Sequence, residues 1–124
     1  MKIIYSNKKT QKLCDDYKTA VKILGNQVAD RLMDLMNAIE AFPNLLDLSN
    51  GLPQYRLHSL TANRNNQYSL VISKSSKWRL IIYPLDENEK ILTDKSNEKL
   101  MLSKAVAIEV VEVSEHYAWY EKKS

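Results

Sequence analysis

The sequence predicts an α+β domain, in which an N-terminal helical hairpin packs on one face of a twisted antiparallel sheet of about four to five strands. The first third of the chain predicts helices, because apolar residues recur there at every third or fourth position. The later part predicts strands, because its apolar runs are rich in aromatic and branched residues and have polar connections. The helices precede these strands instead of alternating with them, which favours an antiparallel sheet with the helices on one face.

The N-terminal part is expected to form a short strand at residues 2–6 and then two helices. The first helix is predicted at residues 10–24, where apolar side chains form one stripe and Gly25 follows as a C-terminal cap. The second is predicted at residues 27–41, because Pro43 disfavours helix in the residue before it. Helices joined by so short a turn should form an antiparallel hairpin.

The rest of the chain is expected to supply the other strands, at residues 55–60, 68–73, 78–83 and 105–113. Short helical turns are expected at residues 44–49 and 98–102. Residues 86–104 are polar, carry charges of both signs and are interpreted as an insertion. At 124 residues, the usual length of one domain predicts a single domain over residues 1–124.

The composition indicates in which cellular compartment the protein is expected. Cys14 is the only cysteine, so an internal disulfide and a two-cysteine metal site are excluded, and a reducing cytoplasm fits best. On a helical apolar stripe, Cys14 is expected to be a small core residue. The N-terminus lacks signal-peptide features, and no stretch approaches the roughly 18 apolar residues of a membrane span. We therefore expect a cytoplasmic protein with no membrane partner and no cofactor or metal.

Charge is distributed unevenly along the chain. Residues 48–85 contain no Asp or Glu, although the chain has 15 of them, and its net charge is only +3. A strand-rich segment that collects positive charge and excludes negative charge predicts a polyanionic partner. The cations of this acid-free stretch are Arg56, Arg64, Lys74, Lys77 and Arg79.

The two histidines are the residues best suited to chemistry. His58 lies in the acid-free stretch and His116 follows the last predicted strand. If these strands are neighbours, two acid–base groups and several arginines meet on one surface, which is what RNA cleavage by the 2′-hydroxyl requires. The simpler interpretation is that each histidine is a hydrogen-bonded structural residue and that the arginines cover a solvated sheet face.

Several short motifs follow one another in the second half of the chain: Leu57-His58-Ser59-Leu60, Arg64, Tyr68-Ser69-Leu70, Trp78-Arg79-Leu80 and Val113-Ser114-Glu115-His116. Their order resembles that of the RelE superfamily of bacterial toxins, most closely its HigB-type (killer protein) branch. The resemblance implies a small RelE-type α+β fold and metal-independent cleavage of mRNA on the ribosome. It also implies a HigA-like helix-turn-helix antitoxin, bound in a toxin–antitoxin hetero-oligomer.

The resemblance also assigns roles. His58 and His116 take the positions of catalytic acid–base histidines, and Arg64 and Arg79 those of arginines that bind phosphate or stabilise the transition state. The further RNA contacts that we expect are Arg56, Lys74, Lys77 and Tyr117.

Three positions depart from the family pattern. The lysine after L-H-x-L is Thr61, the next glycine is Ala62, and the tyrosine before the last histidine is Glu115. A missing charged donor commonly costs about a hundredfold in rate, and Lys74 or Lys77 is the candidate replacement. Two alternatives to the nuclease therefore stay open. One is a weakened homologue that binds antitoxin, RNA or the ribosome as a regulatory module. The other is a ParE-like, gyrase-directed toxin, which has no need of paired histidines.

RNA binding by the acid-free stretch is expected to weaken steeply as salt rises, because phosphate contacts release counterions. Fluorescence anisotropy with a labelled RNA from about 50 to about 200 mM salt measures this slope. A flat response would mean that Arg56, Arg64 and Arg79 only cover the surface.

Overall fold

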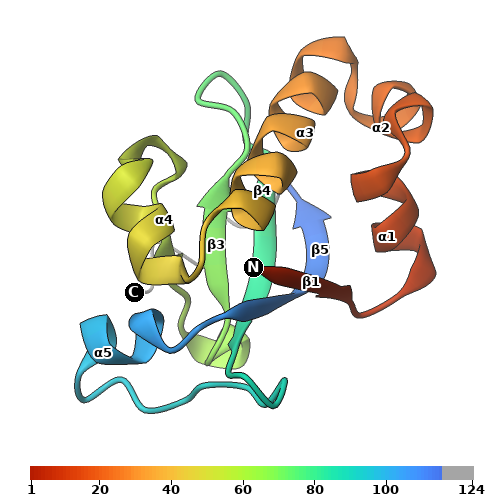
Figure 1. The fold of residues 1–124 in the computed structure, drawn as a ribbon. Coiled ribbons are helices and arrows are strands. Elements are labelled where there is room, and N and C mark those ends of the chain that lie inside the picture. Colours follow the sequence, from red (N-terminus) through yellow and green to blue (C-terminus); the bar gives the residue numbers. More distant parts are fainter. Residues whose placement is uncertain (116–124) are drawn as a thin grey trace.

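The centre of the molecule is a five-stranded sheet in the order β1-β5-β4-β3-β2 (Figure 1). This computed structural model describes residues 1–115. The α+β class predicted from the sequence is confirmed. Neighbouring strands are antiparallel except β1 and β5, which run parallel. A parallel pair needs a long crossover connection, and here the segment between the two strands contains the helices of the described residues and the other three strands. The strands are β1 (Lys2–Tyr5), β2 (His58–Ser59), β3 (Tyr68–Val71), β4 (Arg79–Leu85) and β5 (Ala107–Ser114).

The first predicted helix is interrupted, and the single helix expected at residues 10–24 is therefore wrong. It forms two helices, α1 (Lys8–Asp15) and α2 (Tyr17–Leu24), with Asp16 extended between them. The Asp16 carboxylate accepts hydrogen bonds from the backbone N–H of Lys18 and from the Thr19 hydroxyl, at 3.2 and 2.8 Å. A short acidic side chain that caps the next helix competes with continuation of the first.

Helix α3 (Asn26–Ala41) forms the predicted hairpin with α2 and crosses one face of the sheet (Figure 1). Its apolar stripe is fully buried at Leu32, Leu35 and Ile39, in one core cluster with Leu70 and Leu80 of the sheet. This packing of a helical stripe against alternate strand residues holds the two layers together.

Cys14 lies in the same core, as predicted, at 2% exposure. Burial, and then the charge of Asp15, raise the pKa of its thiol to about 12, so it is not a nucleophile at neutral pH. None of the helices in residues 1–115 is both long and apolar enough to cross a membrane.

The strand expected at residues 55–60 is much shorter in the structure. Helix α4 (Leu45–Gly51) is followed by the 3-10 turn η1 (Pro53–Tyr55), and Arg56 then takes a left-handed conformation with φ 49°. Only the two residues of β2 pair with β3, at the edge of the sheet. Pro53 starts the 3-10 turn because its fixed φ and missing N–H suit a helix start.

Residues 86–104, interpreted as an insertion, pack on the rest of the structure. The Leu92 N–H donates to the Pro84 carbonyl at 2.9 Å, and α5 (Glu98–Ser103) buries Met101. The Tyr68 hydroxyl donates to the Glu98 carboxylate at 2.7 Å. This segment therefore supports the start of β3 through the side of the sheet that faces the core.

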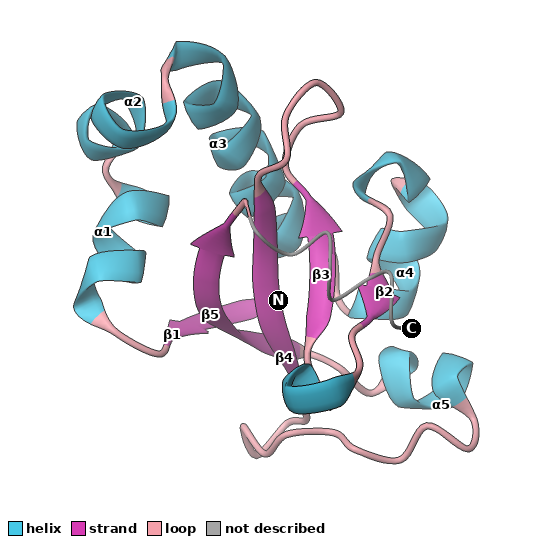
Figure 2. Ribbon diagram, turned by 180° about the vertical axis from the view of Figure 1, so that it is seen from behind, coloured by secondary structure: helices cyan, strands magenta, loops and turns pink. Residues whose placement is uncertain are grey.

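The face of the sheet opposite α3, called here the open face, has its own small apolar cluster. Leu60 and Ile81 are buried there with Val111 packed against them, separate from the core under α3. Figure 2 looks onto this face, with α3 behind the sheet. The open face is thus apolar at its centre and polar around it.

Substituting Ala62→Gly is expected to raise the free energy of unfolding by about 0.5–1 kcal/mol. Ala62, where the resemblance predicts a glycine, has φ 58°, a conformation that costs an L side chain energy and glycine almost none. Urea unfolding measures the change. In the matched control, Ala38→Gly inside α3 should lower the same free energy by about 1 kcal/mol. Equal destabilisation by both substitutions would contradict the account.

Candidate functional site

A row of four residues crosses the open face from β2 to β5. The register places His58 opposite Ser69, Ser69 opposite Ile81, and Ile81 opposite Glu112. Opposed residues of antiparallel strands project from the same face, and their sequence neighbours, such as Leu70, point into the core under α3. At a strand spacing of about 4.8 Å, the backbones of His58 and Glu112 lie about 14 Å apart.

Arg64 reaches across the open face to the far end of this row. It is the last residue of the 3-10 turn η2 (Ala62–Arg64), and its guanidinium forms an ion pair with Glu112 of β5. The same guanidinium donates to the Gln67 side-chain oxygen at 3.1 Å. The Arg64 side chain is only 19% exposed, so solvent screens this pair less than an exterior one. A carboxylate from outside the acid-free stretch therefore neutralises one of its arginines.

His58 is held by the backbone just before it. Its Nδ1 lies 2.8 Å from the Arg56 carbonyl oxygen, which can only accept a hydrogen bond. Nδ1 is therefore the protonated nitrogen of the neutral ring, and Nε2 is the nitrogen able to accept a proton. Arg56, an expected RNA contact, is exposed, and its left-handed conformation leads the chain from η1 toward β2.

Arg79 begins β4 on the same face. It lies two residues from Ile81, opposite Val71 and Ser114. Strand spacing and a rise of about 3.4 Å per residue put its backbone about 12 Å from that of His58. Its Nη1 donates to the carbonyls of Ser76 and Trp78, at 3.1 and 2.9 Å. The structure therefore brings His58, Arg64 and Arg79 to one face.

Two buried hydroxyl groups accompany these side chains. Within residues 1–115, the Oγ of Ser69 and the Oγ1 of Thr61 are buried and have no hydrogen-bond partner. An unsatisfied buried polar group costs roughly 1–3 kcal/mol, and native structures contain few of them. Ser69 is fully buried and sits directly beside His58 in the row.

The lysines proposed to replace the one missing at Thr61 lie elsewhere. Lys74 and Lys77 are exposed on the turn between β3 and β4. The Leu60 N–H donates to the Gln67 carbonyl, which places Thr61 beside the start of β3, while the turn follows its end. About six strand residues, or roughly 20 Å, separate Thr61 from the turn that carries the two lysines. Neither lysine therefore lies beside Thr61.

The remaining predicted site residues, His116 and Tyr117, lie outside the described residues, which end at Glu115. Sequence reasoning also missed Glu112. Glu109 and Glu112 are three positions apart, so they would face opposite sides of a regular strand. An irregularity between Ile81 and Ile82 shifts the register, so both carboxylates project from the open face.

No family model matches this chain, and no curated protein matches it either. Among solved structures it is similar to a YoeB/ParE toxin from Agrobacterium tumefaciens, at 14% identity and a TM-score of 0.47. The match covers 94% of this chain and 100% of that one. A likeness at this level carries no conclusion about activity or partner.

A double-mutant cycle on Arg64 and Glu112 is expected to give a coupling free energy of about 1–2 kcal/mol in urea unfolding. The pair joins two elements and is partly buried. Replacing either partner with glutamine should therefore lower the free energy of unfolding more than the same substitution in an exposed pair does. The control cycle uses Arg31 and Asp34, which lie 3.9 Å apart with side chains 65% and 61% exposed. That pair should couple by less than about 0.5 kcal/mol. Similar coupling in the two cycles would show that Arg64–Glu112 behaves as an ordinary surface pair.

Proposed function

We propose that this protein is the toxin of a type II toxin–antitoxin pair and cleaves mRNA on the ribosome. The observation that supports this most directly is the gathering of His58, Arg64 and Arg79 on the open face, although they come from β2, η2 and β4. Histidine exchanges protons near neutral pH, and arginine stabilises charge on phosphate oxygens. Together these side chains provide acid–base and electrostatic catalysis for attack by a 2′-hydroxyl group.

In the proposed reaction, the 2′-oxygen of one nucleotide attacks the adjacent phosphorus while the bond from phosphorus to the 5′-oxygen breaks. His58 accepts the proton of the 2′-hydroxyl at Nε2, because Nδ1 already donates to the Arg56 carbonyl. A second group must donate a proton to the departing 5′-oxygen, and we assign this role to His116. One fragment then ends in a 2′,3′-cyclic phosphate and the other begins with a 5′-hydroxyl.

Arg64 and Arg79 have the proposed task of stabilising the extra negative charge on the phosphorus oxygens. In the free protein the Arg64 guanidinium is held by the Glu112 carboxylate. Guanidinium binds phosphate and carboxylate with the same forked geometry, so the RNA phosphate takes the place of the carboxylate. The ion pair thereby keeps Arg64 oriented across the open face until RNA arrives.

The proposed partners are those that the resemblance to the RelE superfamily implies. A HigA-like helix-turn-helix antitoxin would mask or distort the open face within a hetero-oligomer, and the ribosome would present mRNA to it. Both partners place the protein in the cytoplasm.

A second candidate function is a regulatory module that binds RNA, ribosome or antitoxin without efficient cleavage. Two observations favour it: Arg64 is neutralised by Glu112, and Thr61 stands where a lysine is expected, with no lysine of the β3–β4 turn beside it. A ParE-like, gyrase-directed toxin has no use for an acid–base histidine, and we place it last.

Induction of the chain alone in bacteria is expected to arrest growth and to produce truncated, translation-dependent mRNA. His58→Ala and Arg64→Gln should each lower cleavage about a hundredfold, because each removes one group that acts in the transition state. Growth curves and primer extension on a reporter mRNA measure the two effects. The matched control is Lys22→Gln, an exposed charge on α2 away from the open face, which should arrest growth as the wild type does.

Each alternative function predicts a different result in this experiment. Full toxicity of both site variants would contradict the assignment of His58 and Arg64. Intact mRNA together with DNA-damage signalling would favour the gyrase-directed toxin. Wild-type protein that binds RNA or ribosomes but neither arrests growth nor cleaves mRNA would favour the regulatory module.

A further inference from the structure

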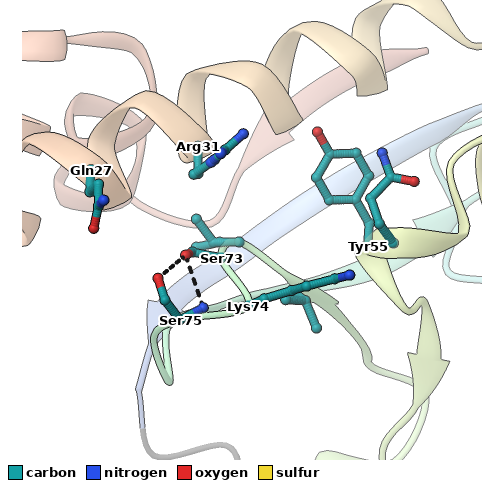
Figure 3. A pocket seen from close by; sticks show the side chains of 9 residues that line it. Gln27, Arg31, Tyr55, Ser73, Lys74 and Ser75 are labelled. Carbon is teal, nitrogen blue, oxygen red and sulfur yellow. Dashed lines mark hydrogen bonds between the residues drawn. The ribbon is translucent and has the colours of Figure 1, made fainter.

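A pocket lies outside the open face, on the side of the sheet that carries α3. It has a volume of about 390 Å³, within the roughly 300–1,000 Å³ typical of small-molecule sites. Its walls are the N-terminal half of α3, the turn η1 and the β3–β4 turn (Figure 3). The residues whose chemistry matters below are Gln27, Arg31, Gln54, Tyr55, Ser73 and Lys74.

The charged residues that line the pocket are both basic. Arg31 and Lys74 enter it from two separate elements, and none of the described residues that line it is acidic. Arg31 does pair with Asp34 at 3.9 Å, but with side chains 65% and 61% exposed this is a weak surface contact. The neighbouring hollow along α3 contains Asp30 and Asp34, so an anion is favoured in the first pocket over the second.

An aromatic ring stands beside these cations. Figure 3 shows Arg31 extending from α3 toward Tyr55, with Lys74 on the turn beneath them. Burial, and then the charge of Asp34, raise the pKa of Tyr55, so its hydroxyl stays protonated at neutral pH. Cations for a phosphate, a ring for stacking and amide side chains for a base edge are how proteins hold single-stranded nucleic acid.

The pocket adjoins the strand pair that carries Arg79. Val71 lines the pocket and is also the register partner of Arg79, which projects from the open face. The β3–β4 turn therefore forms a rim between the two places, with exposed Lys74 and Lys77 on it. A polyanionic strand that leaves the open face beyond Arg79 can cross this rim into the pocket.

We propose that this pocket binds one nucleotide of a single-stranded RNA, with its phosphate between Arg31 and Lys74 and its base against the Tyr55 ring. The choice of RNA as the natural ligand rests on the function proposed above, whereas binding of a nucleotide does not. The pocket is a contact for the flanking strand, separate from the residues that act on the cleaved bond.

The first experiment titrates the full-length protein with adenosine 5′-monophosphate and follows backbone amide shifts by NMR. Amides around Tyr55 and Ser73 should shift and saturate, and inorganic phosphate alone should shift the Ser73 region without affecting Tyr55. No saturable shift with the nucleotide would overturn the proposal. So would shifts of the same amides with an acidic peptide but none with the nucleotide, because the pocket would then be a protein contact.

The second experiment measures the Kd of a labelled oligonucleotide by fluorescence anisotropy. Arg31→Gln, Lys74→Gln and Tyr55→Leu should each weaken binding about tenfold, within the range for lost stacking or phosphate contacts. The control Lys22→Gln removes an exposed charge elsewhere and should change Kd less than about twofold. Cleavage at saturating RNA should stay unchanged in Arg31→Gln and Tyr55→Leu, since these two side chains are proposed to act on binding alone.

The two proposals fail in different ways. If RNA is cleaved and all three pocket variants bind it like the control, the pocket proposal is wrong and the nuclease stands. If the nucleotide shifts the pocket amides and no RNA is cleaved, the pocket proposal stands and the nuclease is wrong.

Discussion

The open face depends on one interaction, the ion pair between Arg64 and Glu112. Strand β2 contributes only two residues to the sheet, too few to fix the loops on either side of it. The guanidinium of Arg64 ties the turn after β2 to β5, across the two strands between them. That connection holds a cation over the row that begins at His58, on the face that has Leu60 and Ile81 at its apolar centre. The proposed chemistry starts from this arrangement, and the RNA phosphate then takes the place of the Glu112 carboxylate on Arg64.

The fold was predictable wherever local preference and burial agree. Helix α3 and strands β3, β4 and β5 lie within a few residues of the expected ranges, because their apolar patterns are those of buried faces. The failures have local causes. Asp16 caps a new helix instead of continuing the old one, and the 3-10 turn that begins at Pro53 includes Tyr55, where the expected strand began. Side-chain capping and a fixed φ outweighed the apolar pattern at both places.

The candidate site was predictable in part. The order of the motifs identified His58, Arg64 and Arg79, and these residues do share one face of the sheet. It did not identify Glu112, because the register shift beside Ile81 determines the face of the sheet from which Glu112 projects. The acid-free stretch is not free of carboxylates once the chain is folded. Glu112 reaches Arg64, and Glu98 accepts from Tyr68, so two carboxylates return to it from elsewhere in the chain. An uneven distribution of charge along a sequence can thus identify a surface. It does not determine the electrostatic potential at each point of that surface, because residues from other segments contribute to it.

The central claim is that the open face cleaves RNA by attack of a 2′-hydroxyl group. The most direct test is the chemistry of the new RNA ends, made by purified protein on ribosome-bound mRNA. The account predicts a 2′,3′-cyclic phosphate on the upstream fragment and a 5′-hydroxyl on the downstream one, because the 2′-oxygen takes the place of the departing 5′-oxygen on phosphorus. Fragments with a 3′-hydroxyl and a 5′-phosphate would contradict it, since they come from attack by water instead.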